Sequence, residues 1–358
     1  MRFFLIYPGH KIATIDIAIG YEQALRDLGH EVLAYNYHNS LTFYNHALDY
    51  WQKKNPAFTY DMEDWLRISS EQAVLEALRF ARDGADFVVL AVCGFAFHRE
   101  AFLMLAKALG LPVVLILTES PYADMRIGTT PGQIDMIQQS GIELAFTNER
   151  NSVRYLSENK TEVPIVYLPH SYDPERHNPQ PPEDGYTSDV FFCGTRYQER
   201  EALFDGVDWT DIDARIIGAE LVDREVKGGL DNAEVVKYYH GTKVALNIHR
   251  TTCGVFDERL VHVQDGQAWS LGPRAYEIAA CGAFQISDDS RGELFDVFGD
   301  TVPTYRTAEE CEALIRRYLA DETARKELAR QQHEAVEPCS FRARAEAILL
   351  PAIQAEVM

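Results

Sequence analysis

The sequence predicts an α/β protein with two doubly wound domains, each a parallel sheet covered by helices on both faces. Three observations support this fold class. Short, continuously apolar segments alternate with amphipathic segments through both halves of the 358-residue chain, as is typical of parallel strands and their crossover helices. A polar, proline-rich segment at 169–185 separates the halves. The length fits about two domains.

In the first half, apolar segments predict six strands, and the amphipathic segments between them predict helices. The expected strands are 2–7, 31–35, 87–92, 112–117, 144–147 and 163–168, and the expected helices are 17–28, 71–83 and 100–109. The segment from Asn36 to Asp64 shows neither pattern and is rich in aromatic residues. We expect an irregular loop there, and because a loop of this length usually has a function, we assign it to acceptor recognition.

The second half repeats the alternation. The expected strands are 189–193, 214–218, 243–248, 283–286 and 301–305, and the expected helices are 233–240, 273–281, 308–319, 322–337 and 340–357. We therefore expect two Rossmann-like domains, at 1–170 and 186–339, that face a central cleft. In open α/β sheets, ligands bind at the carboxyl ends of the strands, so the residues after each strand are the first candidates for a site.

Charge and cysteine content exclude several classes. The net charge of −21 disfavours general binding to DNA, RNA or anionic membranes. The six cysteines are scattered without a C-x-x-C pair, which is typical of a reducing compartment. The amino terminus reads as a strand rather than a secretory signal, and the longest apolar run, 87–97, is too short to cross a membrane. We expect a cytoplasmic protein without a membrane partner.

The segment 270–286 carries the strongest functional signal. Pro273 fits the first turn of a helix and Gly282 its end. A helix that begins at such a turn, after Ser270 and Leu271, can direct free N–H groups at a phosphate. Arg274 adds a positive charge beside them. These features predict a binding site for an anionic group at the helix start.

Glu277 lies one helical turn after Arg274, on the same face. Its carboxylate can accept hydrogen bonds from the hydroxyls of a ribose. Phosphate at the helix start and ribose one turn along would suit a nucleotide-sugar. An ordinary i,i+3 surface pair is the alternative; we favour binding because the glycine, proline, arginine and glutamate fall together in one short apolar helix.

Other polar residues follow predicted strands of the second half. Gly194 and Arg196 follow 189–193, where backbone N–H groups and a guanidinium could neutralise a diphosphate; a plain turn with a solvated arginine is equally compatible. Asn247 and His249 end the strand 243–248 and would face the ligand crevice. A capped strand end with a satisfied histidine is nearly as good an interpretation of that pair.

Two residues of the first half are candidate acceptor-site bases. His10 follows the first strand, and Glu119 follows 112–117, so both would face the crevice. Asp211 and Asp213 form a D-x-D motif, but at the amino end of a strand, where we expect solvent. There is no other metal-ligand spacing, no P-loop and no dinucleotide fingerprint, so we expect neither a metal nor a cofactor.

The second half resembles the CgeB-like glycosyltransferases, a bacterial and phage group with the two-domain GT-B fold. The resemblance covers 189 to about 349 and rests mainly on the phrase Pro-Arg-Ala-Tyr-Glu-Ile-Ala-Ala-Cys-Gly at 273–282, with Asp-Val-Phe-Phe-Cys-Gly at 189–194 and Leu-Asn-Ile-His at 246–249. It implies that the second domain holds the nucleotide, that Glu277 binds ribose, and that the last helix, 340–358, crosses back to the first domain. Trp269 stands near the place where retaining relatives often carry an acid, so the stereochemistry stays open.

Together these observations predict a metal-independent glycosyltransferase. The donor would be a nucleotide-diphospho-sugar, with a UDP-sugar expected, and the acceptor hydroxyl would belong to a protein or glycan in preference to modified DNA. A nucleotide-sugar isomerase or epimerase on the same scaffold, and a noncatalytic nucleotide-sugar binding protein, are the alternatives.

Overall fold

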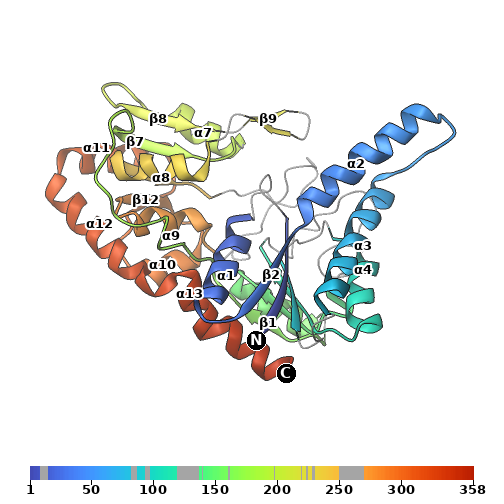
Figure 1. Cartoon of the computed structure of the whole chain (residues 1–358). Helices are drawn as coiled ribbons and strands as arrows, with labels where there is room; N and C mark the ends of the chain where they lie inside the picture. The colour runs from blue at the N-terminus through green and yellow to red at the C-terminus, as the bar shows by residue number, and fades with distance from the viewer. Residues whose placement is uncertain are drawn as a thin grey trace. The chain divides into compact units, whose positions relative to one another are not determined.

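The computed structural model describes residues 1–8, 15–81, 87–92, 97–118, 137–138, 140–159, 162–196, 198–218, 220–222, 225–227, 230–249 and 270–358. Two compact units make up the chain (Figure 1). Unit 1 comprises Met1–Pro169 with Phe341–Met358, and unit 2 comprises His170–Ser340. Each is a parallel sheet with helices packed against it, as the alternating sequence pattern predicts.

Unit 1 contains a six-stranded parallel sheet with the order β2-β1-β3-β4-β5-β6. Its strands are β1 Arg2–Tyr7, β2 Glu31–Asn36, β3 Phe87–Ala91, β4 Val113–Leu117, β5 Leu144–Thr147 and β6 Ile165–Tyr167. Its helices are α1 Ile15–Asp27, α2 Tyr37–Lys54, α3 Met62–Ala81, α4 Arg99–Leu103 (continued by a π-helix at Met104–Ala108) and α6 Arg150–Asn159. The strands β3, β4 and β5 are buried along their whole length, which explains their continuously apolar sequences.

The two faces of this sheet belong to separate hydrophobic clusters. Phe3 and Leu5 of β1 point into one cluster with α1, and Phe4 and Ile6 point into the other with α2, α3 and α4. Alternate residues of a strand face opposite sides, so a wholly apolar strand needs helices on both sides.

The expectation of an irregular loop from Asn36 to Asp64 was wrong. Most of it is α2 and the start of α3, and α2 projects outward from the sheet (Figure 1). Only Tyr37, Ser40 and Leu41 of α2 are buried. The indole N–H of Trp65 in α3 donates to the carbonyl of Leu41 at 2.7 Å and ties the pair together. Because the rest of α2 keeps aromatic side chains exposed, its sequence lacks the usual apolar–polar periodicity.

The chain's last residues pack against α1 within unit 1. They form α13 Phe341–Arg344, a π-helix at Ala345–Leu349 and α14 Leu350–Glu356, where the sequence predicts one helix. The ring of Phe341 lies on Gly20, so closely that a Cβ at Gly20 would come within 2.2 Å of it. It also makes an edge contact with Tyr21. The glycine in α1 thus leaves the space in which Phe341 of the carboxyl-terminal segment packs.

Unit 2 contains a five-stranded parallel sheet with the order β13-β12-β11-β7-β8. Its strands are β7 Ser188–Cys193, β8 Ala214–Ile217, β11 Thr242–Asn247, β12 Gln285–Asp288 and β13 Thr304–Tyr305. Its helices are α7 Gln198–Gly206, α8 Asn232–Gly241, α9 Pro273–Ala280, α10 Gly292–Phe298, α11 Ala308–Ala320 and α12 Glu322–Val336, with a 3-10 turn at Glu337–Cys339. The sequence analysis missed α7, α10 and the antiparallel hairpin of β9 Glu220–Val222 and β10 Glu225–Lys227.

Both sheets share one strand order. If the strands of each parallel sheet are numbered in chain order, both sheets begin with the order 2-1-3-4-5. The direction in which strands are added to the sheet reverses between the first and third strands. In unit 2 this switch point lies between β7 and β11. Ligands of doubly wound sheets bind at such a point, at the carboxyl ends of the strands. Unit 2 therefore presents a specific edge on which to look for a site.

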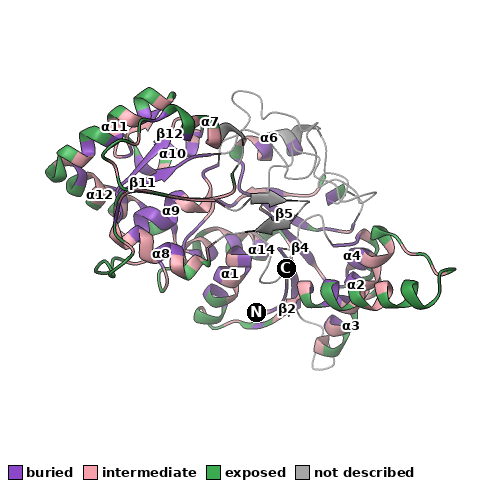
Figure 2. Cartoon of the chain, turned by 90° about the horizontal axis from the view of Figure 1, so that it is seen from above, coloured by how far each residue is buried: buried purple, intermediate pink, exposed green. Residues whose placement is uncertain are grey.

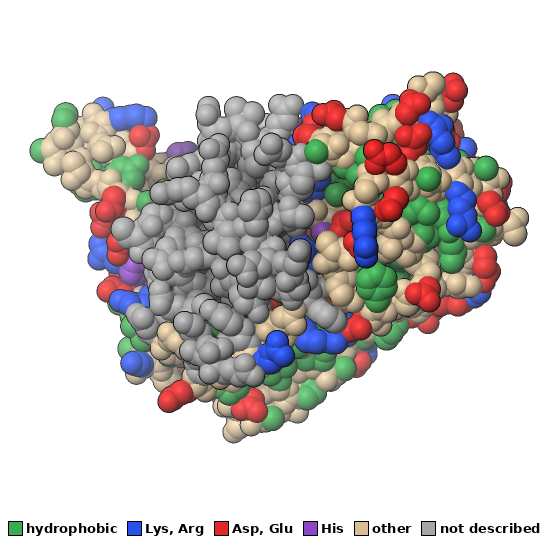
Figure 3. Space-filling view, turned by 180° about the vertical axis from the view of Figure 1, so that it is seen from behind, with side chains coloured by type: hydrophobic (Ala, Val, Ile, Leu, Met, Phe, Trp, Pro, Cys, Tyr) green, Lys and Arg blue, Asp and Glu red, His purple; other side chains and the backbone are tan. Residues whose placement is uncertain are grey.

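The distribution of buried and charged residues agrees with this layered fold. The strands β3, β4 and β5 and most of α9 are buried, while α11 and α12 expose their outer faces (Figure 2). Acidic and basic side chains are interspersed over the part of the surface that Figure 3 describes. Among the helices of the described segments, none is both long and apolar enough to cross a membrane.

Candidate functional site at the carboxyl edge of unit 2

Arg200, in the first turn of α7, links the two strand ends at the switch point. Its Nη1 donates to the carbonyl of Thr195 at 2.8 Å, and its Nη2 and Nε donate to the carbonyl of Ile248 at 2.6 and 3.2 Å. The guanidinium also lies 5.3 Å from the ring centroid of Phe192. Thr195 follows β7 and Ile248 follows β11, so one side chain fixes both loops relative to each other.

Gly194 is required by this packing. A Cβ at Gly194 would lie 2.9 Å from the Phe192 ring and 3.0 Å from Nη1 of Arg200. Its backbone N–H donates to the carbonyl of Ile217 at 3.1 Å. Since a glycine is needed here for close packing and its N–H is already bonded, Gly194 shapes the loop more than it offers a donor to a ligand.

Arg196 already has an anionic partner. Its Nε and Nη2 donate to the two carboxylate oxygens of Glu201 at 2.7 and 2.6 Å, a bidentate ion pair. The side chain is 44% exposed, and its stem lies over Gly218, where a Cβ would come within 2.1 Å. Arg196 therefore stands at the edge as expected, but a phosphate would have to compete with Glu201 for it.

Asn247 and His249 join a buried polar cluster with Asp288 at the end of β12. The backbone N–H and Nδ1 of His249 lie 2.7 and 3.0 Å from Oδ2 of Asp288. The Asn247 amide lies 3.5 Å from Nε2 of His249. Burial by itself raises the pKa of Asp288, but His249 and the hydrogen bonds from His249 and Ser290 hold that pKa well below its usual range. The arrangement fixes the orientation of the imidazole ring.

The helix α9 begins as the sequence predicts, with Gly272 as N-cap and Pro273 in its first position. Residues 275–280 are all buried, because α9 runs through the interior of unit 2. Its last turn closes at Gly282, which has φ 74°, the left-handed conformation that favours glycine. Since α9 leads into β12, its first turn lies at the carboxyl edge of the sheet.

The start of α9 offers fewer free donors than its sequence suggests. The N–H of Leu271 donates to the carboxylate of Glu293 at 2.9 Å, and the N–H of Ala275 donates to the carbonyl of Gly272 at 3.2 Å. Pro273 has no N–H. Leu271 is wholly buried and Ser270 nearly so. Leu271 therefore anchors the helix start inside the protein, and Arg274 is the residue there that can reach a ligand.

Arg274 lies between α8 and α9. Its Nη1 is 3.4 Å from the hydroxyl of Tyr239 and 3.3 Å from Oε2 of Glu277, and its Nη2 is 3.4 Å from Oδ1 of Asn232. These distances are long for charge-assisted hydrogen bonds. Burial alone lowers the pKa of Arg274, but Tyr239 and Glu277 more than offset this and raise it. The guanidinium is thus a fixed cation, loosely held and 32% exposed.

Glu277 is a buried carboxylate rather than a member of a surface pair. It is 8% exposed and shares its surroundings with the buried His177. Burial lowers the pKa of His177, while Glu277 raises it and Arg274 lowers it. Both residues also act on Cys193 at the end of β7, where burial raises the pKa of the thiol, Arg274 lowers it and Glu277 raises it. Arg274 contacts the hydroxyl of Tyr239, whose ring packs edge-on against Phe191 of β7, so the start of α9 lies near this strand.

Of the candidate bases, neither His10 nor Glu119 lies among the described residues. Among those that are described, no group of three or more His, Cys, Asp or Glu side chains could hold a metal ion. Asp211 and Asp213 are exposed at the amino end of β8, on the opposite edge from the strand ends discussed above.

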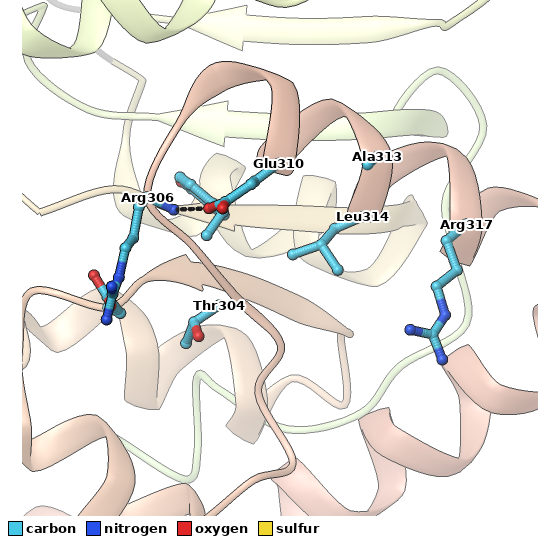
Figure 4. A pocket seen from close by; sticks show the side chains of 8 residues that line it. Thr304, Arg306, Glu310, Ala313, Leu314 and Arg317 are labelled. Atoms are coloured by element: carbon cyan, nitrogen blue, oxygen red, sulfur yellow. Dashed lines mark hydrogen bonds and ion pairs between the residues drawn. The ribbon is translucent and has the colours of Figure 1, made fainter.

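A separate pocket of about 550 Å³ lies beside β13 and α11 (Figure 4). Its lining residues are Asp289, Thr304, Tyr305, Arg306, Glu310, Ala313, Leu314 and Arg317. Arg306 is paired with Asp289, and its backbone N–H donates to Glu310 at 2.7 Å. None of the candidate residues lines this pocket. Of its two arginines, Arg306 is neutralised by Asp289 and Arg317 lies over the ring of Tyr318, so we assign no function to the pocket.

Sequence reasoning missed Arg200, Asp288, Tyr239 and Glu293. Asp288 is the last residue of β12 and could have been found by the rule that located His249. Arg200 and Tyr239 lie inside helices, and Glu293 lies in the first turn of α10, far along the chain from the groups that they contact. Nothing in their local sequence indicates those contacts.

Comparison with known proteins agrees with this geometry. Residues 198–349 match a protein-family model described as "Glycosyl transferase-like". The match includes Asn247, His249, Arg274 and Glu277 and begins after Arg196. The spore protein CgeB of Bacillus subtilis is 25% identical over 195 residues, which are 51% of this chain and 57% of CgeB. The chain thus spans little more than half the length of this relative.

Two solved structures share the fold over both units. Anabaena Alr3699/HepE in complex with UDP-glucose has a TM-score of 0.58 at 10% identity, over 99% of this chain and all of HepE. Sucrose-phosphate synthase from Thermosynechococcus elongatus also has a TM-score of 0.58, at 12% identity, over 99% of this chain and 98% of the synthase. The chain is therefore similar to glycosyl transferases over residues 198–349 and to CgeB over about half of its length, and it has the two-domain GT-B fold.

Proposed function

We propose that this protein transfers a sugar from a nucleotide-diphospho-sugar, a UDP-sugar in the first instance, to an acceptor hydroxyl. The observation that carries the proposal is the position of Arg274 and Glu277, half-buried and buried, in α9 next to Tyr239, whose ring packs against Phe191 of β7. HepE, which shares the fold, is known in complex with UDP-glucose, and CgeB shares part of the sequence.

Arg274 and Glu277 would contact different parts of the nucleotide, the diphosphate and the ribose. The guanidinium would stabilise the negative charge that develops on the leaving diphosphate, and its long contacts leave its donors available for shorter ones. Glu277 uses one carboxylate oxygen toward Arg274. A carboxylate has about four acceptor positions, so it can accept the two ribose hydroxyls without giving up that ion pair.

The other candidate residues would assist Arg274 and Glu277. Arg200 would keep the loops after β7 and β11 in place, and Arg196 would approach the diphosphate by exchanging Glu201 for it. His10 or Glu119 would act as the base toward the acceptor. Fixed guanidinium groups can replace a divalent cation at a diphosphate, so we propose that transfer needs no metal, and that it takes place in the cytoplasm on a protein or glycan.

The test is incubation of the purified protein with UDP-sugars, with and without acceptor preparations, in buffer with EDTA and in buffer with Mg²⁺. Sugar on the acceptor and released UDP would support transfer, and equal rates in the two buffers would support metal independence. Conversion of the donor without acceptor would make the protein an isomerase. UDP-sugar binding without turnover would make it a binding protein.

A further inference from the structure

The outer face of α2 carries three large aromatic side chains that the fold does not bury. Phe43 is 65% exposed, Tyr50 56% and Trp51 60%. They stand at i, i+7 and i+8, the spacing that places residues on one side of a helix. The buried residues of α2 are Tyr37, Ser40 and Leu41, all within its first five positions, and the three exposed aromatic residues follow them along the helix. We refer to Phe43, Tyr50 and Trp51 as the aromatic face.

The aromatic face is too small to hold two protein copies together. Phe, Tyr and Trp side chains bury about 150–250 Å² each, so at these exposures they offer on the order of 350 Å². A stable protein–protein interface needs about 800 Å² from each partner. An exposed apolar patch of this size is nonetheless typical of a binding surface, which favours a slender ligand over a protein domain.

The charges around the aromatic face argue against a polyanion. The described helix α2 carries Asp49, Lys53 and Lys54, and Lys53 is paired with Asp49. Lys54 lies 5.7 Å from the Tyr50 ring. One uncompensated lysine is a small attraction against a chain of net charge −21, so nucleic acid or an anionic polymer would be repelled at longer range.

Aromatic rings and neutral polar groups together suit a carbohydrate chain. A pyranose ring has a face of C–H groups that stacks on the electron-rich face of an aromatic ring, and hydroxyls at its rim that need hydrogen-bond partners. The exposed Asn39 and His46 lie beside the aromatic face and can provide these. At about 1.5 Å per residue, Phe43 and Tyr50 are separated by about 10 Å along the helix, roughly the length of two linked sugar rings.

We propose that the aromatic face of α2 binds a neutral polysaccharide. The identification of this ligand with the acceptor rests on the glycosyl transfer proposed above, because a polymer bound to unit 1 would bring its hydroxyl groups to the enzyme. The binding itself does not depend on turnover. Figure 3 shows hydrophobic side chains at the surface of the projecting end that α2 forms, at the upper left.

The experiment is affinity electrophoresis in native gels that contain hydroxyethyl cellulose, glycol chitin or dextran. We expect at least one polymer to retard the wild-type protein. The triple variant Phe43→Ala, Tyr50→Ala, Trp51→Ala should bind that polymer at least tenfold more weakly. The matched control is Leu75→Ala, Leu78→Ala, which removes exposed side chains of α3 and should be retarded like the wild type. Circular dichroism and UDP affinity check that both variants are folded.

Several results would overturn the inference: no retardation by any of the three polymers, equal retardation of the triple variant, or stronger retardation by heparin or single-stranded DNA. A wild-type dimer in analytical ultracentrifugation that the triple variant converts to a monomer would assign the face to a second copy instead. Retardation without UDP-sugar turnover would preserve this inference and refute glycosyl transfer. Turnover without retardation would do the reverse.

Discussion

Replacement of Arg200 by alanine tests whether the two strand ends of unit 2 are held by one side chain. The variant leaves the carbonyls of Thr195 and Ile248 without their guanidinium partner. A hydrogen bond to a charged group contributes about 1.5–3 kcal/mol. We take the lower end of that range for each carbonyl and add about 0.5 kcal/mol for the lost contact with Phe192. The expected loss is about 3.5 kcal/mol.

This loss is local, so native-state hydrogen exchange of the amides at the ends of β7 and β11 is the suitable assay. A loss of about 3.5 kcal/mol corresponds to a roughly 300-fold fall in protection, since 1.4 kcal/mol is a factor of ten. Arg200→Lys should recover part of it, because one ammonium cannot reach both carbonyls in the same geometry. The exposed Arg330→Ala is the control and should leave these amides unchanged. Protection within threefold of wild type in Arg200→Ala would refute the reasoning.

Three further outcomes are expected. Glu277→Ala should weaken UDP binding by about 1–3 kcal/mol, because ribose hydroxyls lose their acceptor; calorimetry with unchanged affinity would contradict the site. Gly20→Ala should lower the melting temperature, because crowding against Phe341 costs about 1–3 kcal/mol and exceeds the gain of up to about 1 kcal/mol in helix propensity. The double variant Gly20→Ala, Phe341→Leu should recover stability. A Gly20→Ala protein as stable as the wild type would exclude the clash. Burial lowers the pKa of His177, so the unfolded chain binds its proton first as pH falls below about 6.5. The stabilising contribution of neutral His177 is therefore present above that pH and is lost below it, by at most about 1.4 kcal/mol per pH unit. The difference in unfolding free energy between the wild type and His177→Gln should change with pH between 5 and 7. A constant difference would count against this pKa shift.

The structure also changes how the candidate residues can act. Arg196 and Arg274 were expected to bind the diphosphate, and each is paired with a carboxylate of its own domain, Glu201 and Glu277. The two pairs differ in strength, since the first is bidentate at 2.6 and 2.7 Å and the second is a single contact at 3.3 Å. Nucleotide binding should therefore engage Arg274 more readily than Arg196.

The sequence by itself determined the fold class and the position of α9. Strands such as β4 are apolar along their whole length because both faces of a parallel sheet are covered, and Pro273 and Gly282 define the helix through backbone conformations that few other residues tolerate. The same local rules placed Gly194, His249 and Arg274 at strand ends and at a helix start.

Only the tertiary structure decided which of these groups meet, and which are already engaged. The contacts of Arg200 with Ile248, of His249 with Asp288 and of Leu271 with Glu293 join residues 48, 39 and 22 positions apart. Such contacts depend on strand order and crossover geometry, which local periodicity does not encode. The helix α2 was missed for a related reason: its sequence reflects an outward aromatic face as well as the inward one, and the two merge into a pattern without a clear period.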